Sequence, residues 1–204
     1  MRRFLAIIPA AGHSRRMGRP KLLLPLGGQT VIARVLAALD REPVTERVVI
    51  VRQDDEPLQE EVRAAGAMLV VPETPPPDMR TSVEHGLNAV RDRFSPDADD
   101  VWMLVPADHP VLEPMVVDAL VSEWQRRRAD VLVPTYRGRR GHPTLFRWSL
   151  ADAVAGIPPG EGLNRLTRGG RFDVAELPID DPAILTDLDT PEDYETLRRR
   201  WGDL

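Results

Sequence analysis

The 204-residue sequence contains no cysteine, so disulfide bonds, thiolate nucleophiles and cysteine-based metal sites are excluded. It also lacks a long apolar run: no stretch approaches the roughly 18 residues that a membrane-spanning helix needs, and we expect no membrane partner. Internal repeats and low-complexity tails are absent as well. These absences leave a single folded domain spanning residues 1–204 as the expected organisation.

The chain has no block of positive charge to set against its net charge of −5. Its longest basic runs, residues 126–128 and 198–200, each adjoin a helical pattern and are interpreted as solvated helix ends. Proteins that bind nucleic acids usually gather Lys and Arg on one face. We therefore expect no nucleic-acid partner.

The N-terminus begins with Met1-Arg2-Arg3 and an apolar run over residues 4–11. This run is short and leads into glycine-rich, charged sequence rather than into a cleavage site, which favours a buried strand over a signal peptide. The expected compartment is the cytoplasm.

Short apolar runs rich in β-branched residues alternate with segments of helical spacing. Strands are predicted over residues 4–9, 47–51, 68–71, 101–105, 131–135 and 184–188. Helices are predicted over residues 30–39, capped by Thr30, over 81–94, capped by Thr81 or Ser82, and over 113–128 and 191–201. This alternation predicts an α/β fold, a three-layer Rossmann-like arrangement with a mostly parallel, mixed central sheet. Ligands of such sheets bind beyond the carboxyl ends of the strands.

A phosphate-binding loop is predicted directly after the first strand, where residues 10–21 read AAGHSRRMGRPK. The small residues Ala10, Ala11 and Gly12 allow backbone N–H groups to approach an anion, and three side chains supply positive charge: Arg15, Arg16 and Lys21. The loop is not a Walker loop, because five residues rather than four separate its glycines and the lysine comes later, and it lacks the three glycines of the dinucleotide fingerprint. The alternative is a turn whose cations only keep it hydrated.

The pattern A-A-G-x-S-x-R-M-G-x-x-K, followed by L-L-P and a glycine pair, resembles the signature loop of the MobA-like nucleotidyltransferases. More narrowly, it is similar to the molybdenum cofactor cytidylyltransferase branch, although Pro9 stands where that family usually has Leu. The resemblance implies that the backbone of residues 10–12 and the side chains of Ser14, Arg15 and Lys21 hold the nucleotide. Lys21 would neutralise charge on the triphosphate.

Carboxylates follow two of the predicted strands. Asp108 lies in a proline-flanked turn after residues 101–105, a position suited to Mg²⁺, which prefers one or two carboxylates together with phosphate oxygens. Asp187 and Asp189 would point to the same side of an extended chain, and their segment resembles the family's D-I-D-T-P-E-D-Y motif. By resemblance, Asp108 and one of this pair bind Mg²⁺. Alternatively, Asp189 caps the following helix while Asp187 binds the metal.

Two further segments resemble the family's substrate-binding regions. Residues 77–87 match the base-recognition segment of the cytidylyltransferase branch at Met79 and Ser82, with Asp78 in place of the usual Gly, which implies CTP as the nucleotide. Residues 138–143 match G-x-x-G-H-P, which implies a phosphorylated acceptor such as molybdopterin. The side chains expected to meet that acceptor are those of Arg139, Arg140 and His142.

No nucleophile–base pair is predicted, and the chemistry needs none if the acceptor is a phosphate monoester, whose second pKa is roughly 6. Catalysis would then consist of in-line positioning and charge neutralisation by Lys21, by Arg15 or Arg16, and by Mg²⁺ bound at Asp108. Two alternatives remain: a nucleotidyltransferase acting on a sugar or alcohol phosphate, and a non-catalytic nucleotide-binding partner of a molybdoenzyme.

Overall fold

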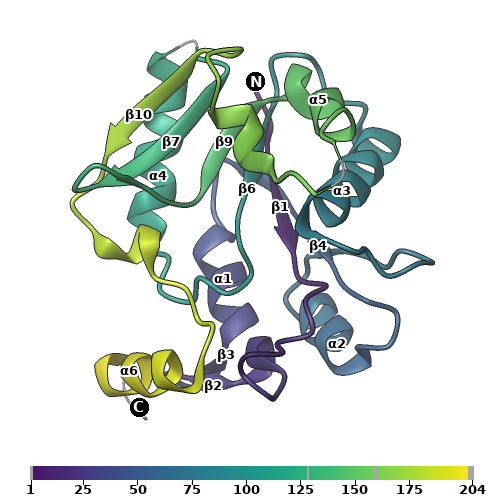
Figure 1. The fold of residues 1–204 in the computed structure, drawn as a ribbon, viewed down its shortest axis with the longest axis vertical. Helices are drawn as coiled ribbons and strands as arrows, with labels where there is room; N and C mark the ends of the chain where they lie inside the picture. The colour runs from purple at the N-terminus through teal and green to yellow at the C-terminus, as the bar shows by residue number, and fades with distance from the viewer. Residues whose placement is uncertain (1, 128, 159, 202–204) are drawn as a thin grey trace.

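A computed structural model describes residues 2–127, 129–158 and 160–201. In it, eight strands of the described chain form one sheet with the order β10-β7-β9-β6-β1-β4-β5, and β8 pairs with β7 at its end (Figure 1). The strands are β1 (Phe4–Pro9), β4 (Val44–Ile50), β5 (Met68–Val70), β6 (Val101–Leu104), β7 (Val131–Tyr136), β8 (Arg139–Arg140), β9 (Thr144–Arg147) and β10 (Val174–Pro178). Neighbours are parallel except where β9 and β8 pair, so the predicted mostly parallel, mixed sheet is confirmed.

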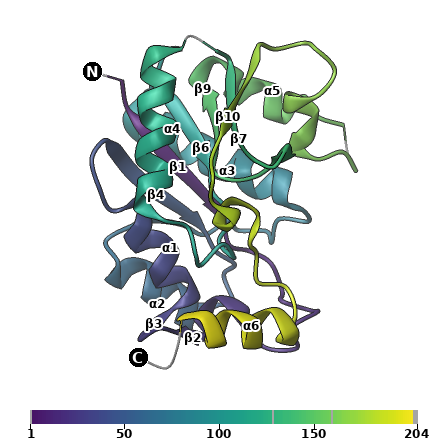
Figure 2. The same cartoon turned by 90° about the vertical axis from the view of Figure 1, so that its left-hand side faces the viewer.

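Helices cover both faces of the sheet, as Figure 2 shows from the side. One face carries α1 (Val31–Leu39), α2 (Glu56–Ala64) and α4 (Pro114–Arg126), and the other carries α3 (Met79–Phe94), α5 (Ala151–Ala155) and the 3-10 turn η3 (Leu163–Thr167). The remaining elements are α6 (Pro191–Trp201), the small hairpin of β2 (Pro25–Leu26) and β3 (Gln29–Thr30), and the 3-10 turns η1 (Lys21–Leu23), η2 (Trp148–Leu150) and η4 (Pro182–Leu185).

Strand β1 illustrates why the central strands are apolar throughout. Phe4, Ala6 and Ile8 point into the core beneath α1 and α4, whereas Leu5 and Ile7 point into the core beneath α3. All five side chains are almost fully buried. Such two-sided burial demands an apolar residue at every position rather than an alternating pattern.

The predicted helix starts are partly confirmed. Thr30 caps α1, since its hydroxyl accepts a hydrogen bond from the Ala33 N–H (3.2 Å). Helix α3, however, begins at Met79, and its cap is Asp78 rather than Thr81 or Ser82. The Asp78 carboxylate accepts from the Thr81 N–H at 2.7 Å, so the residue that departs from the family pattern acts as an N-cap. Helix α4 covers residues 114–126 of the predicted 113–128; residue 128 lies outside the described part of the chain.

The strand predicted over residues 184–188 is wrong. The chain there forms η4 and then an irregular segment, because Asp181 accepts from the Ala183 N–H and Pro182 occupies the first position of a 3-10 turn. The strand of this region is β10, which pairs in parallel with β7. Strand β9 and the helices α2 and α5 were not among the predicted elements.

Among the described residues, no helix combines the length and the apolar character needed to cross a membrane.

Candidate functional site

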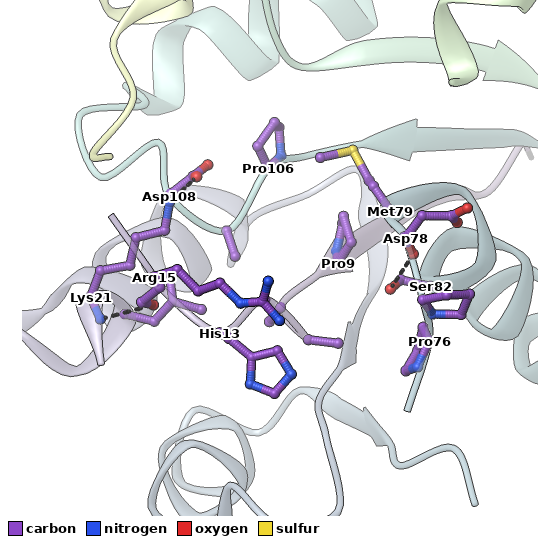
Figure 3. A pocket seen from close by; sticks show the side chains of 17 residues that line it. Pro9, His13, Arg15, Lys21, Pro76, Asp78, Met79, Ser82, Pro106 and Asp108 are labelled. Carbon is purple, nitrogen blue, oxygen red and sulfur yellow. Dashed lines mark hydrogen bonds and ion pairs between the residues drawn. The ribbon is translucent and has the colours of Figure 1, made fainter. Parts of the chain in front are cut away.

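A cavity of about 370 Å³ opens at the carboxyl ends of β1 and β6 (Figure 3). Its walls are the loop after β1, the proline-rich loop before α3 and the turn after β6. The lining residues are Pro9, Ala10, Ala11, Gly12, His13, Ser14, Arg15, Lys21, Leu22, Pro76, Pro77, Asp78, Met79, Ser82, Pro106, Ala107 and Asp108. Every residue predicted to bind the nucleotide is among them, as is Asp108.

The loop after β1 is shaped by its own backbone. The Ser14 carbonyl accepts hydrogen bonds from the N–H groups of Met17 and Gly18, both at 3.1 Å, and Ser14 and Gly18 have positive φ angles of 50° and 70°. The Ser14 hydroxyl oxygen accepts from the Lys21 N–H at 3.3 Å, and Met17 is buried in the core. These contacts close residues 14–21 into a compact loop and direct Lys21 toward Asp108.

Lys21 bridges two carboxylates that are distant in sequence. Its Nζ lies 2.6 Å from Asp108 Oδ2 and 2.9 Å from Asp189 Oδ1. Its side chain is only 15% exposed. Burial alone would lower the pKa of Lys21, but the charges and hydrogen bonds of Asp108 and Asp189 outweigh burial and raise that pKa above its ordinary value. The ammonium group is therefore charged at neutral pH.

Asp189 is held by a second cation, Arg16, whose Nη2 lies 2.8 Å from Asp189 Oδ2. Burial works to raise the pKa of Asp189, but the hydrogen bond and charge of Lys21, followed by those of Arg16, lower it overall. Asp189 does not cap α6. That role belongs to Thr190, whose hydroxyl oxygen accepts from the Asp193 N–H while the Asp193 carboxylate accepts from the N–H of Thr190.

Asp187 stands apart from this arrangement. The irregular segment replaces the extended chain that would have turned it to the same side as Asp189, and no ion pair joins Asp187 to Lys21 within the described structure. Burial, followed by the charge of Asp189, raises the pKa of Asp187. In the part of the chain that the structure describes, no group of three or more Asp, Glu or His side chains could hold a metal ion unaided.

The start of α3 forms the opposite wall of the cavity. Met79 is 53% exposed and lines the cavity together with Pro76 and Pro106, as labelled in Figure 3. Ser82 is buried, and its hydroxyl donates to the Asp78 carbonyl at 3.1 Å. Met79 and the prolines that line the cavity give it an apolar wall, while the Ser82 hydroxyl oxygen retains capacity to accept a hydrogen bond.

His142 and His109 meet edge to face, with ring centroids 5.5 Å apart. Burial lowers the pKa of His142 to about 4, with a smaller contribution from His109, and burial also lowers the pKa of His109. His142 Nδ1 is buried without a hydrogen-bond partner in the described structure. His142 is not among the residues that line the cavity; it contacts His109, which belongs to the turn that carries Asp108.

Arg139 and Arg140, the other residues predicted to meet the acceptor, are exposed on β8 and do not line the cavity. Arg140 is occupied elsewhere: its Nε lies 2.7 Å from Glu176 Oε1, and its Nη1 donates to the Thr167 carbonyl at 2.9 Å.

Arg52 is a residue of this region that the sequence analysis missed. It follows β4, and its Nη1 donates to the Gly12 carbonyl at 3.0 Å, while its Nε pairs with Asp54 at 2.8 Å. Gln59 in α2 supports it by donating to the Arg52 carbonyl at 2.9 Å. Arg52 could have been predicted from the sequence, because it is the first polar residue after the strand predicted over residues 47–51, where ligands of such sheets bind.

A family model described as the MobA-like NTP transferase domain matches residues 6–176. Among curated proteins, the purine catabolism protein PucB of Bacillus subtilis (strain 168) is 29% identical over 208 residues, covering 96% of each chain. The 2-C-methyl-D-erythritol 4-phosphate cytidylyltransferase of Nitrosospira multiformis is 32% identical over 165 residues, covering 72% of this chain and 71% of that one.

Solved structures share the fold. The crystal structure of Rv0371c from Mycobacterium tuberculosis H37Rv superposes with a TM-score of 0.82 at 24% identity, covering 98% of this chain and 99% of that chain. Rv0371c has also been crystallised in complex with manganese, and that structure superposes with a TM-score of 0.75 at 23% identity over 97% of this chain and 98% of that chain.

Proposed function

This chain belongs to the MobA-like NTP transferase family and is a nucleotidyltransferase, and from that premise we propose that it transfers CMP from CTP to a phosphorylated small molecule such as molybdopterin, releasing pyrophosphate.

The observation that carries the proposal is the position of Lys21. The half-buried ammonium group of Lys21 contacts one carboxylate from the turn after β6 and one from residues 182–190, here called the C-terminal segment. It lies in a cavity walled by the loop after β1. A triphosphate in this cavity would meet Lys21, the side chains of Ser14 and Arg15, and the N–H groups of Ala10, Ala11 and Gly12. Such preorganised donors stabilise charge that develops on a transferring phosphoryl group.

The residues also fit Mg²⁺. The Lys21 ammonium acts as a stand-in cation, since a single positive charge already lies within 3 Å of both Asp108 and Asp189. Two carboxylates completed by phosphate oxygens are the set that Mg²⁺ prefers. We therefore assign the metal to Asp108 and Asp189, the two carboxylates that contact Lys21, and not to Asp187. When bound, Mg²⁺ would supply charge neutralisation on the phosphates.

The chain's own residues orient the reaction. Lys21 and Arg15 hold the phosphates so that an oxygen of the acceptor phosphate attacks the α-phosphorus in line. The new bond joins that oxygen to the α-phosphorus, the bond from the α-phosphorus to the oxygen bridging to the β-phosphate breaks, and pyrophosphate leaves with the electron pair. The acceptor oxygen is already ionised near neutral pH, so no general base is required.

CTP is proposed because Met79 and Ser82 provide an apolar contact and a hydroxyl at the cavity wall, as the base-recognition segment of the cytidylyltransferase branch requires. The cytidylyltransferase name of the N. multiformis relative supports the same base. For the acceptor, we propose molybdopterin, with His142, Arg139 and Arg140 on its side of the site, and a molybdoenzyme as the recipient of the product.

The test is pyrophosphate release with CTP, GTP, ATP and UTP against a panel of acceptors. Molybdopterin and 2-C-methyl-D-erythritol 4-phosphate represent the two acceptor classes, a phosphorylated pterin and an alcohol phosphate. We expect turnover with CTP and molybdopterin. Turnover only with the alcohol phosphate would transfer the assignment to the second class, and tight nucleotide binding without turnover on any acceptor would contradict the catalytic proposal.

A further inference from the structure

Gly141 lies against the backbone of the C-terminal segment more closely than any side chain permits. A Cβ atom added to Gly141 would lie 2.3 Å from the Ile184 carbonyl oxygen and 2.9 Å from its carbonyl carbon. Real Cβ atoms essentially never come closer than 3.0 Å to such atoms. The tight contact involves backbone rather than the end of a flexible side chain, so rotation of a side chain cannot relieve it.

Hydrogen bonds fix both sides of this contact. The Gly141 N–H donates to the Pro134 carbonyl on β7 at 2.9 Å, and the His142 N–H donates to the Ile184 carbonyl at 2.9 Å. Ile184 is itself fully buried in the core. Gly141 is thus hydrogen-bonded to the sheet just after β8, and the start of the C-terminal segment packs directly against it.

The same segment is held again four residues later. The Leu188 N–H donates to the Asp108 carbonyl at 2.9 Å, and Leu188 is fully buried. Asp187 and Asp189 flank this anchor. The distance from Asp189 to the turn that carries Asp108 therefore depends on two backbone hydrogen bonds, one made by His142 and one made by Leu188.

We propose that Gly141 is a positioning residue that sets Asp189 opposite Asp108, a role that rests on the proposed function of these carboxylates. Because Gly141 has no side chain, its backbone can contact the backbone of Ile184. The hydrogen bond from the His142 N–H to the Ile184 carbonyl then fixes the position of the C-terminal segment relative to β7. With a larger residue at position 141, Ile184 is displaced, the hydrogen bond at Leu188 is strained, and Asp189 loses its place beside Lys21. Residues 141–143 thereby help to position the carboxylates proposed to bind the metal, in addition to any contact with an acceptor.

The first experiment measures the affinity of the protein for Mn²⁺ alone, by electron paramagnetic resonance, in the wild type and in Gly141→Ala. Since the groups that orient metal ligands typically contribute 10- to 100-fold to metal affinity, we expect a loss of roughly 10-fold. Gly86→Ala is the matched control. Its Cβ would also be crowded, 2.8 Å from Ile50 Cδ1, but on the α3 side of the sheet, away from the carboxylates.

Gly86→Ala is expected to bind Mn²⁺ as the wild type does, despite its lower stability. An unchanged affinity in Gly141→Ala overturns the proposal. An equal loss in both variants also overturns it, because the loss would then come from general destabilisation.

The second experiment needs no variant and applies even if Gly141→Ala does not fold. Amide hydrogen exchange of the wild type is followed by NMR with and without Mg²⁺. Because coupling between sites is reciprocal, an ion on Asp108 and Asp189 should slow exchange at the N–H groups of His142 and Leu188. The N–H of Ala10, which donates to the Ile50 carbonyl at 2.9 Å, serves as the internal reference.

Unchanged exchange at both His142 and Leu188 in saturating Mg²⁺ overturns the positioning role. Neither experiment measures turnover. Failure to transfer CMP would therefore refute the proposed function, whereas the metal affinity and the exchange rates test the positioning role of Gly141 separately.

Discussion

At the scale of single residues, Lys21 pairs with the two carboxylates that we propose as metal ligands. Its Nζ contacts both Asp108 and Asp189 at hydrogen-bonding distance. A triphosphate entering the cavity would compete with these carboxylates for the ammonium group, and a divalent ion would replace the ammonium group as their counter-charge. Removing Lys21 therefore has separable effects on catalysis and on metal binding.

We expect Lys21→Ala to lower kcat for pyrophosphate release by roughly 10²- to 10³-fold, because a preorganised charge at the transferring phosphate is lost. Arg19→Ala is the control, since Arg19 belongs to the same loop but lies over the Tyr194 ring, 5.1 Å from its centroid, and outside the cavity lining. A rise in KM with kcat unchanged would mean that Lys21 binds ground state and transition state equally, contrary to its proposed role.

His142 makes stability depend on pH. Its pKa is about 4 in the folded protein against 6.5 as the ordinary value, so between these pH values the unfolded chain binds more protons and acidification favours unfolding. Urea denaturation at pH 7 and pH 5 should show a loss of about 1–2 kcal/mol from this group. His142→Gln should flatten that part of the pH dependence, and an identical dependence in the variant would contradict the assignment.

At the scale of elements, the cavity is built where loops leave parallel strands, and neighbouring elements hold those loops in shape. Arg52, beyond β4, holds the Gly12 carbonyl of the loop after β1. Helix α3 packs on β1 and β4 through Gly86, and its N-terminus carries Met79 and Ser82 into the cavity wall.

Arg52→Ala should weaken CTP binding by about 10-fold, because the loop loses a charge-assisted hydrogen bond of roughly 1.5 kcal/mol or more. The effect should appear in the CTP dissociation constant measured by calorimetry. Arg91→Ala is a suitable control, since Arg91 pairs with Asp152 on the surface. Equal affinities for the Arg52 variant and the wild type would show that the loop keeps its shape unaided.

Gly86→Ala should lower the free energy of unfolding by about 1–3 kcal/mol, since the added methyl group would meet Ile50 and Ile7 at 2.8 and 3.0 Å. Gly156→Ala is the matched case without crowding: the nearest atom to its Cβ is the Ala153 carbonyl oxygen at 3.6 Å. We expect a change of within about 0.5 kcal/mol there. Equal urea midpoints for the two variants would contradict the close packing of α3.

At the scale of the whole molecule, the proposed site joins both ends of the chain. The loop after β1 supplies Lys21 and Arg16, and the segment before α6 supplies Asp189. Tyr194 of α6 adds a further link, donating to the Pro25 carbonyl at 2.6 Å. A ligand that binds across these parts should therefore stabilise the entire fold.

CTP with Mg²⁺ should raise the melting temperature, with a stabilisation of about 2.7 kcal/mol at a ligand concentration 100 times Kd. GTP should produce a smaller shift in the same thermal denaturation assay if Met79 and Ser82 select the base. Equal shifts for CTP and GTP would mean that the triphosphate alone is recognised.

The sequence by itself determined the α/β class, and it predicted the residues that line the cavity proposed for the nucleotide. Runs such as residues 4–9 are apolar at every position because both faces of the strand are buried, and that requirement is local enough to read directly. The residues of the predicted phosphate-binding loop are contiguous, so their shared chemistry was also visible in the sequence. All eight predicted nucleotide-binding residues line the cavity.

Only the tertiary structure decided which of Asp187 and Asp189 contacts Lys21, and it replaced the predicted strand 184–188 by η4 and an irregular segment. Helical and strand periodicity describe neighbours along the chain, whereas Lys21 and Asp189 are 168 positions apart. Their meeting depends on the backbone contact of Gly141 with Ile184 and on the hydrogen bond from Leu188 to Asp108. The hydrogen bond from Leu188 uses backbone atoms that almost every residue possesses, and the glycine at position 141 does not by itself reveal which backbone it contacts, so neither could be predicted before the chain is folded.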